Sequence, residues 1–157
     1  MATIHVPGDA HATPVGRHQW LPYSDARKKK VVEDALFILK HNIKGSRPCN
    51  RCFEALSGGR SFDDVLGDAG VFISFDPANR QGDFGATIGS DVTITDFSIR
   101  MGRWTVAATL VHELAHVNGA PGDTHDAENT LTCCGLGALH DPNIIGAADE
   151  PPGSRMA

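Results

Sequence analysis

Residues 104–119 read WTVAATLVHELAHVNG, and this stretch decides the fold. Apolar side chains recur in it every three or four residues, which is the spacing of one face of an α-helix: Ala107, Leu110, Val111, Leu114 and Val117. Gly119 and Pro121 follow directly, and both residue types end helices. The stretch therefore predicts a partly buried helix from Trp104 to Asn118.

Strand signals precede this helix. β-Branched and aromatic residues dominate Val71–Phe75 and Asp91–Phe97, and glycine or proline bounds both segments. The segment Phe84–Ile88 fits an edge strand, or the hairpin partner of Val92–Thr95 across Gly89 and Ser90. The sequence therefore predicts a small sheet directly before the helix of residues 104–118.

Further helices are predicted on both sides of these strands. An amphipathic helix begins near Ser24, a suitable N-cap, and ends at Gly45, with four apolar residues at helical spacing: Val32, Leu36, Leu39 and Ile43. The other helical segments are short: Pro48 to Leu56, Phe62 to Leu66, and a helix capped by Asp123 or Thr124 that runs to Cys134.

Together these elements predict one α+β domain over residues 24–145. A short mixed sheet would pack against the N-terminal helix and the helix of residues 104–118. Residues 1–23 are rich in proline and glycine and predict an irregular arm, and residues 146–157 predict a polar C-terminal tail.

Composition narrows the classes of function. The 157 residues carry a net charge of -5, which does not favour nucleic acid as a partner. No apolar stretch approaches the roughly 20 residues of a membrane-spanning helix, and the first residues lack the pattern of a secretory leader. We expect a protein that is made in the cytoplasm, does not bind membranes, and is exported, if at all, by a signal-independent route.

The predicted helix carries His112, Glu113 and His116 in the pattern H-E-x-x-H. Positions i and i+4 lie one turn apart on the same face, so both imidazoles can bind one zinc ion. Zinc lowers the pKa of its bound water towards roughly 7, and Glu113 would take a proton from that water as it attacks a carbonyl. The pattern predicts one catalytic Zn²⁺ held by both histidines, with Glu113 as general base.

On these residues, the segment from Val71 to Leu136 resembles the zincin metallopeptidases. The resemblance implies a small zincin-like domain, a zinc-dependent hydrolase that cleaves peptide bonds, and an edge strand that aligns an extended peptide substrate. The longer string HELAHVNGAPGDTHDAENTLTCC is similar to metallopeptidase domains of bacterial secreted effectors and polymorphic toxins. That similarity implies a peptide or protein substrate and a cognate inhibitor or immunity protein as partner.

A catalytic zinc usually has three protein ligands, so one more is expected. Gly119 matches the turn glycine of the metzincin pattern, but Gly122 stands where that pattern has its third ligand and offers no side chain. We expect His125 to be the third ligand, because imidazole is a preferred zinc ligand and Glu128 on the same helix face could then support a ligand histidine. The alternative third ligands are Glu128, as in gluzincins, and Asp126 or Asp123, as in aspartate-type zincins.

A group that stabilises the tetrahedral oxyanion should also face the metal. The only tyrosine, Tyr23, lies far upstream of the motif. His140 is therefore the predicted stabiliser, with Arg100 or Arg103 behind it.

Four cysteines form two close pairs, Cys49 with Cys52 and Cys133 with Cys134. The first pair lacks the βαβ context of a thioredoxin-type redox motif. Adjacent cysteines rarely bind one zinc ion tetrahedrally, so disulfides from the first pair to the second are favoured over a four-cysteine zinc site. Four buried thiols are the alternative in a reducing compartment.

A second class of function fits the same motif. In a non-catalytic binding or structural module, zinc would only join the two C-terminal helices, and no position for a water molecule would stay open.

Overall fold

The computed structural model describes residues 1–137, and its helices and small mixed sheet confirm the predicted α+β class. In chain order the elements are β1 (Thr3–Ile4), α1 (Ala26–Ile38), the π-helical turn η1 (Leu39–Ile43), α2 (Arg47–Glu54), α3 (Phe62–Leu66), β2 (Phe72–Asp76), β3 (Gly85–Ile88), β4 (Asp91–Thr95), α4 (Asp96–Met101), α5 (Arg103–Val117) and α6 (Asp126–Cys133). The boundary predicted at residue 145 and the tail of residues 146–157 lie outside the described residues.

The sheet has the strand order β1-β2-β4-β3. β1, β2 and β4 run parallel, whereas β3 pairs antiparallel with β4, so that Gly85 lies opposite Ile94. The predicted hairpin across Gly89 and Ser90 is confirmed, and Gly89 adopts the positive φ of 60° that such tight turns favour. The hairpin places β3 at an edge of the sheet.

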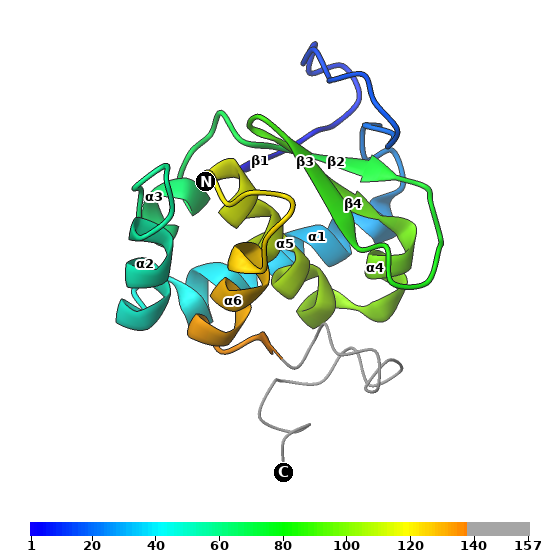
Figure 1. The fold of residues 1–157 in the computed structure, drawn as a ribbon. Coiled ribbons are helices and arrows are strands. Elements are labelled where there is room, and N and C mark those ends of the chain that lie inside the picture. Colours follow the sequence, from blue (N-terminus) through cyan, green and yellow to red (C-terminus); the bar gives the residue numbers. More distant parts are fainter. Residues whose placement is uncertain (138–157) are drawn as a thin grey trace.

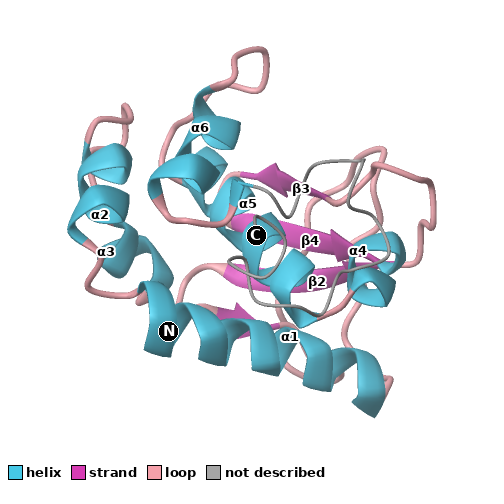
Figure 2. Cartoon of the chain, turned by 90° about the horizontal axis from the view of Figure 1, so that it is seen from below, coloured by secondary structure: helices cyan, strands magenta, loops and turns pink. Residues whose placement is uncertain are grey.

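Helices cover one face of this sheet. Figure 1 shows α1, α5 and α6 beneath the strands, and in Figure 2, seen from that side, α5 lies in front of the sheet with α1 beside it. Ile73, Val92 and Ile94 point from the sheet into this layer and are fully buried. Helix α5 is the central element of the helical layer, because most of its residues are buried. Of the residues that sequence spacing predicts as its buried stripe, Ala107, Leu110, Val111 and Leu114 are buried and Val117 is partly buried.

The N-terminal arm covers the opposite face of the sheet, above the strands in Figure 1. The ring of His11 stacks on Phe72 at 3.7 Å between centroids, and its Nε2 lies 2.6 Å from Asp91 Oδ1. Farther along the arm, Thr93 Oγ1 donates a hydrogen bond to the carbonyl of Gln19. The arm is therefore less irregular than the sequence predicts, since it also contains β1 and packs along two strands.

Helix starts differ from the predictions near residue 25 and near residue 96. Asp25, not Ser24, caps α1, and its carboxylate accepts hydrogen bonds from the backbone N–H groups of Arg27 and Lys28. The strand predicted to reach Phe97 ends at Thr95, whose side chain caps the unpredicted helix α4. In both places a short polar side chain satisfies backbone donors that a helix leaves unpaired.

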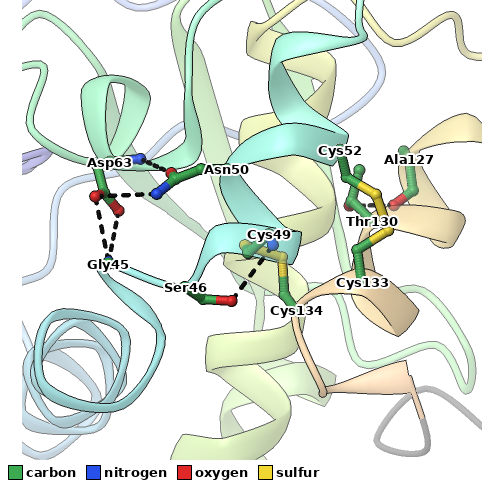
Figure 3. Close-up of a disulfide and its surroundings, with 10 residues drawn as sticks. All are labelled: Gly45, Ser46, Cys49, Asn50, Cys52, Asp63, Ala127, Thr130, Cys133 and Cys134. Carbon is green, nitrogen blue, oxygen red and sulfur yellow. Dashed lines mark hydrogen bonds between the residues drawn. A yellow bond between two sulfur atoms is a disulfide. The ribbon is translucent and has the colours of Figure 1, made fainter.

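Two disulfides join α2 to the end of α6, as Figure 3 shows. Cys49 is bonded to Cys134 and Cys52 to Cys133, so each cysteine of the first pair bonds to the second pair, as the sequence predicts. Residues 49 and 134 are far apart in the chain, so these bonds restrict the unfolded chain strongly. They fix the position of α6 beside α5, with which α6 packs.

Within the described part of the chain, none of the helices has the length and hydropathy needed to cross a lipid bilayer.

Candidate metal centre

Helix α5 brings the side chains of His112, Glu113 and His116 together. Ligand atoms of all three residues lie within 4.8 Å of one another. Both histidines are partly exposed, whereas Glu113 is only 4% exposed. The structure therefore confirms that the motif lies on one helix face, because the helical repeat places i and i+4 one turn apart.

The two imidazoles point their Nε2 atoms at each other across 3.2 Å. Both Nδ1 atoms face acceptors: His112 Nδ1 lies 2.7 Å from Glu128 Oε2, and His116 Nδ1 lies 2.8 Å from the carbonyl oxygen of Ala120. A carbonyl oxygen only accepts, and an ionised carboxylate only accepts, so both Nδ1 atoms carry the proton. In neutral rings both Nε2 atoms then present lone pairs to the same point.

Two facing lone pairs repel unless a cation or a proton lies between them. Tetrahedral zinc binds imidazole nitrogen at about 2.0–2.1 Å, which corresponds to a nitrogen–nitrogen separation of about 3.3 Å. The observed 3.2 Å between His112 and His116 fits that value. Imidazoles whose Nδ1 is tied to a carboxylate or carbonyl are also the usual arrangement of metal-bound histidines. These residues fit a zinc ion.

Glu113 is held in place by the edge strand. Thr87 Oγ1 on β3 lies 3.1 Å from Glu113 Oε2 and 3.2 Å from the backbone carbonyl of the same residue. Residue 85 of β3 is glycine where this strand packs tightly on both β4 and α5: a Cβ there would lie 2.6 Å from the carbonyl oxygen of Thr93 on β4 and 3.2 Å from Thr109 Cγ2 on α5. The carboxylate thus has a fixed position beside the two imidazoles.

Electrostatics at the site favour positive charge. Burial lowers the pKa of His112, but the hydrogen bond to Glu128 and the charges of Glu113 and Glu128 outweigh it, so the pKa is raised above its usual value. The negative potential that favours a proton on His112 also favours a divalent cation at the same place.

A groove of about 640 Å³ gives access to these residues. The arm lines it with Arg17, His18 and Trp20, β3 and the turn after it contribute residues 85–89, and α5 contributes the three motif residues. The groove therefore runs beside an edge strand, between the arm and α5.

The remaining predicted ligands, His125, Asp123, Asp126 and Glu128, do not belong to this group of ligand atoms. His125 is exposed at the start of α6 and does not belong to the group of neighbouring ligand atoms, so its role as third ligand stays a prediction. Asp123 and Asp126 are likewise exposed and outside the group. Glu128 lies behind His112, on Nδ1 rather than Nε2, which is the supporting position expected if another residue is the third ligand.

Of the predicted oxyanion stabilisers, the two arginines are not among the groove-lining residues that the structure describes. His140 lies outside the described residues. Tyr23 is buried and donates its hydroxyl hydrogen to the carbonyl of Ser74, and Arg100 pairs with Asp96. Arg103 does not line the groove.

Sequence reasoning missed Thr87, which contacts Glu113, and the pair of His18 and Asp76, of which His18 lines the groove. Thr87 lies in a strand that the sequence predicts, but its contact with Glu113 depends on how closely β3 packs on α5. His18 lies in an arm without periodicity, and it meets Asp76 across 58 positions of sequence. The only signal for this pair in the sequence was the position of Asp76 directly after the predicted strand Val71–Phe75 and before Pro77.

In comparisons with known proteins, no family model, curated protein or solved structure matches the chain. The resemblance to zincins therefore depends on the motif residues and on the geometry described above.

Proposed function

We propose that the protein is a zinc-dependent metallopeptidase with its centre at His112, Glu113 and His116. The observation that supports this most strongly is the pair of Nε2 atoms 3.2 Å apart, each on a ring whose Nδ1 already faces an acceptor. A buried carboxylate lies beside them, where metal-assisted hydrolysis needs a general base.

When bound, zinc would polarise a water molecule and a substrate carbonyl. Glu113 would take a proton from the attacking water and later give it to the leaving amine nitrogen as the C–N bond breaks. Thr87 keeps the Glu113 carboxylate at the position where it can do this. The two histidines would hold the zinc ion, with Glu128 and the Ala120 carbonyl fixing their ring orientations.

An extended peptide fits the groove as an added strand. Within residues 1–137, β3 pairs with β4 on one side only, so its other edge offers backbone donors and acceptors. That edge borders the groove that contains Glu113. Binding along β3 would therefore bring a peptide bond close to the metal centre.

Replacing Glu113 with Gln tests the proposal. The zinc-loaded protein and the variant are each incubated with a peptide library made by digesting a whole proteome, and new N-termini are counted by mass spectrometry. We expect cleavage by the parent and a loss of about 10²–10⁴-fold in the variant, because the general base is removed. Zinc content should stay at one ion per chain in both proteins.

Glu54→Gln, which removes an exposed carboxylate from α2, is the matched control and should cleave like the parent. Unchanged cleavage by the Glu113→Gln protein would contradict the role of the general base. A parent protein that binds zinc but cleaves nothing in the library would instead favour a non-catalytic, zinc-stabilised module.

A further inference from the structure

His18 lies in the same groove as the metal centre but comes from the opposite side of the sheet. Its Nδ1 lies 2.9 Å from Asp76 Oδ2. Asp76 is the last residue of β2, and its side chain is 4% exposed. The second carboxylate oxygen accepts a hydrogen bond of 2.9 Å from the backbone N–H of Ala78. His18 is therefore oriented by a buried carboxylate that is itself anchored.

The alternation of side chains along β2 explains why His18 reaches the groove from the face of the sheet that the arm covers. Side chains alternate along a strand, so Asp76 shares a face of β2 with Phe72, on which the arm packs. Ile73 points the other way, into the layer that contains α5. His18 and the three motif residues thus line one groove from opposite sides of the sheet edge.

His18 does not belong to the compact group of metal-ligating atoms. That group contains His112, Glu113 and His116 alone among the described residues, although His18 lines the same groove. A residue that lines the groove without belonging to that group is placed to contact what fills the groove. In the proposed function, that occupant is the peptide.

The other histidines of the arm have different surroundings. His5 is 8% exposed and pairs with Asp9, and His11 stacks on Phe72 and pairs with Asp91. Neither lines the groove. Three histidine–aspartate pairs therefore occur in this part of the fold, but His18 is the one histidine of the three that lines the groove.

We propose that His18 is a catalytic residue that binds the carbonyl oxygen of the scissile peptide bond, with Asp76 as its positioning residue. The inference rests on the proposed peptidase function. As the water oxygen bonds to the carbonyl carbon, the π-electron pair moves to the carbonyl oxygen, and the Nε2–H group of His18 donates a hydrogen bond to that oxygen. The proton lost by the water goes to Glu113, and no net proton transfer to His18 is needed.

The pairing with Asp76 suits this role. A carboxylate on Nδ1 fixes the orientation of the imidazole ring and therefore the position of Nε2. Such a donor acts mainly on the charge that develops in the transition state, and removing one donor of this kind typically lowers kcat by about 10²–10³-fold. Loss of His18 should therefore change kcat far more than KM.

The test compares His18→Ala, His18→Gln and the control His11→Ala as zinc-loaded full-length proteins. The first readout is zinc per chain. The second is calorimetric binding of a phosphinic glycylglycine analogue, a side-chain-free mimic of the tetrahedral intermediate. The third is kcat and KM for one peptide that the parent cleaves. Thermal unfolding of each protein verifies that it is folded.

We expect one zinc per chain in the parent and in each of these three variants. His18→Ala should bind the phosphinate about tenfold to a hundredfold more weakly and lose kcat with little change in KM. His18→Gln should recover part of both, since its amide N–H lies where Nε2 does, and His11→Ala should match the parent. Asp76→Asn should show a smaller loss of kcat and an altered ¹⁵N shift of the His18 ring nitrogens.

Phosphinate affinity and kcat of His18→Ala within threefold of the parent would overturn the inference while leaving the peptidase function intact. Loss of zinc from His18→Ala would also overturn it, because His18 would then be a metal ligand. A parent without zinc, cleavage or phosphinate binding would overturn the proposed function and this inference together.

Discussion

Removing the Glu128 carboxylate should weaken zinc binding without removing a ligand. Glu128 Oε2 lies 2.7 Å from His112 Nδ1, a distance at the short, charge-assisted end of the range for such hydrogen bonds. The contact orients the ring and makes Nε2 a better donor of its lone pair to the metal. Replacing Glu128 with Ala removes both effects while Nε2 stays in place.

The expected loss of zinc affinity follows from how exposed the side chains of Glu128 and His112 are. Loss of a partner of this kind typically costs 10- to 100-fold in metal affinity. The Glu128 side chain is 46% exposed and that of His112 is 26% exposed, so water screens part of the interaction. We therefore expect the lower end, about tenfold, which corresponds to about 1.4 kcal/mol.

Competition with a chromophoric zinc chelator measures this affinity directly. Glu128→Gln keeps the length of the side chain and should fall between the parent and Glu128→Ala. Glu33→Gln, which removes an exposed charge from α1, should bind zinc like the parent. Affinities of both Glu128 variants within twofold of the parent would refute the reasoning, and complete loss of zinc would show that Glu128 is itself a ligand.

Three further predictions concern other parts of the fold. Gly85→Ala should destabilise the protein by about 1–3 kcal/mol in chemical denaturation, because its Cβ would lie 2.6 Å from the carbonyl oxygen of Thr93, and wild-type stability would contradict this packing. Zinc affinity should rise with pH until His112 is deprotonated, since its raised pKa makes protons compete above the usual range for histidine; a flat pH profile from 5 to 8 would argue against His112 as a ligand. Reducing both disulfides should lower the free energy of unfolding by about 2–5 kcal/mol, and an unchanged thermal midpoint after reduction would show that they add nothing.

Elements with a strong local pattern could be predicted from the sequence. Helix α5 follows from its apolar repeat, and the hairpin of β3 and β4 follows from Gly89 and Ser90 between two β-rich segments. Two motif histidines on one helix face required only the helical repeat. The disulfide pairing between the two cysteine pairs followed from their chemistry and spacing.

Features that depend on distant contacts could not be predicted. Thr95 is both the last residue of β4 and the N-cap of helix α4. Helix α4 was missed because the residue pattern of 91–97 favours a strand throughout. The contact of His18 with Asp76 and that of Thr87 with Glu113 join segments that only the folded sheet brings together. The sequence analysis favours His125 as third ligand on ligand chemistry alone. In the structure His125 is exposed at the start of α6 and lies outside the group formed by the His112, Glu113 and His116 ligand atoms, so its role stays a prediction.

Zinc content of the protein purified without added metal tests the central claim most directly. The account predicts about one zinc per chain by elemental analysis, and loss of that zinc in His116→Ala, in which the second of the two facing imidazoles is gone. A parent protein that holds no zinc even after incubation with the metal would contradict the account.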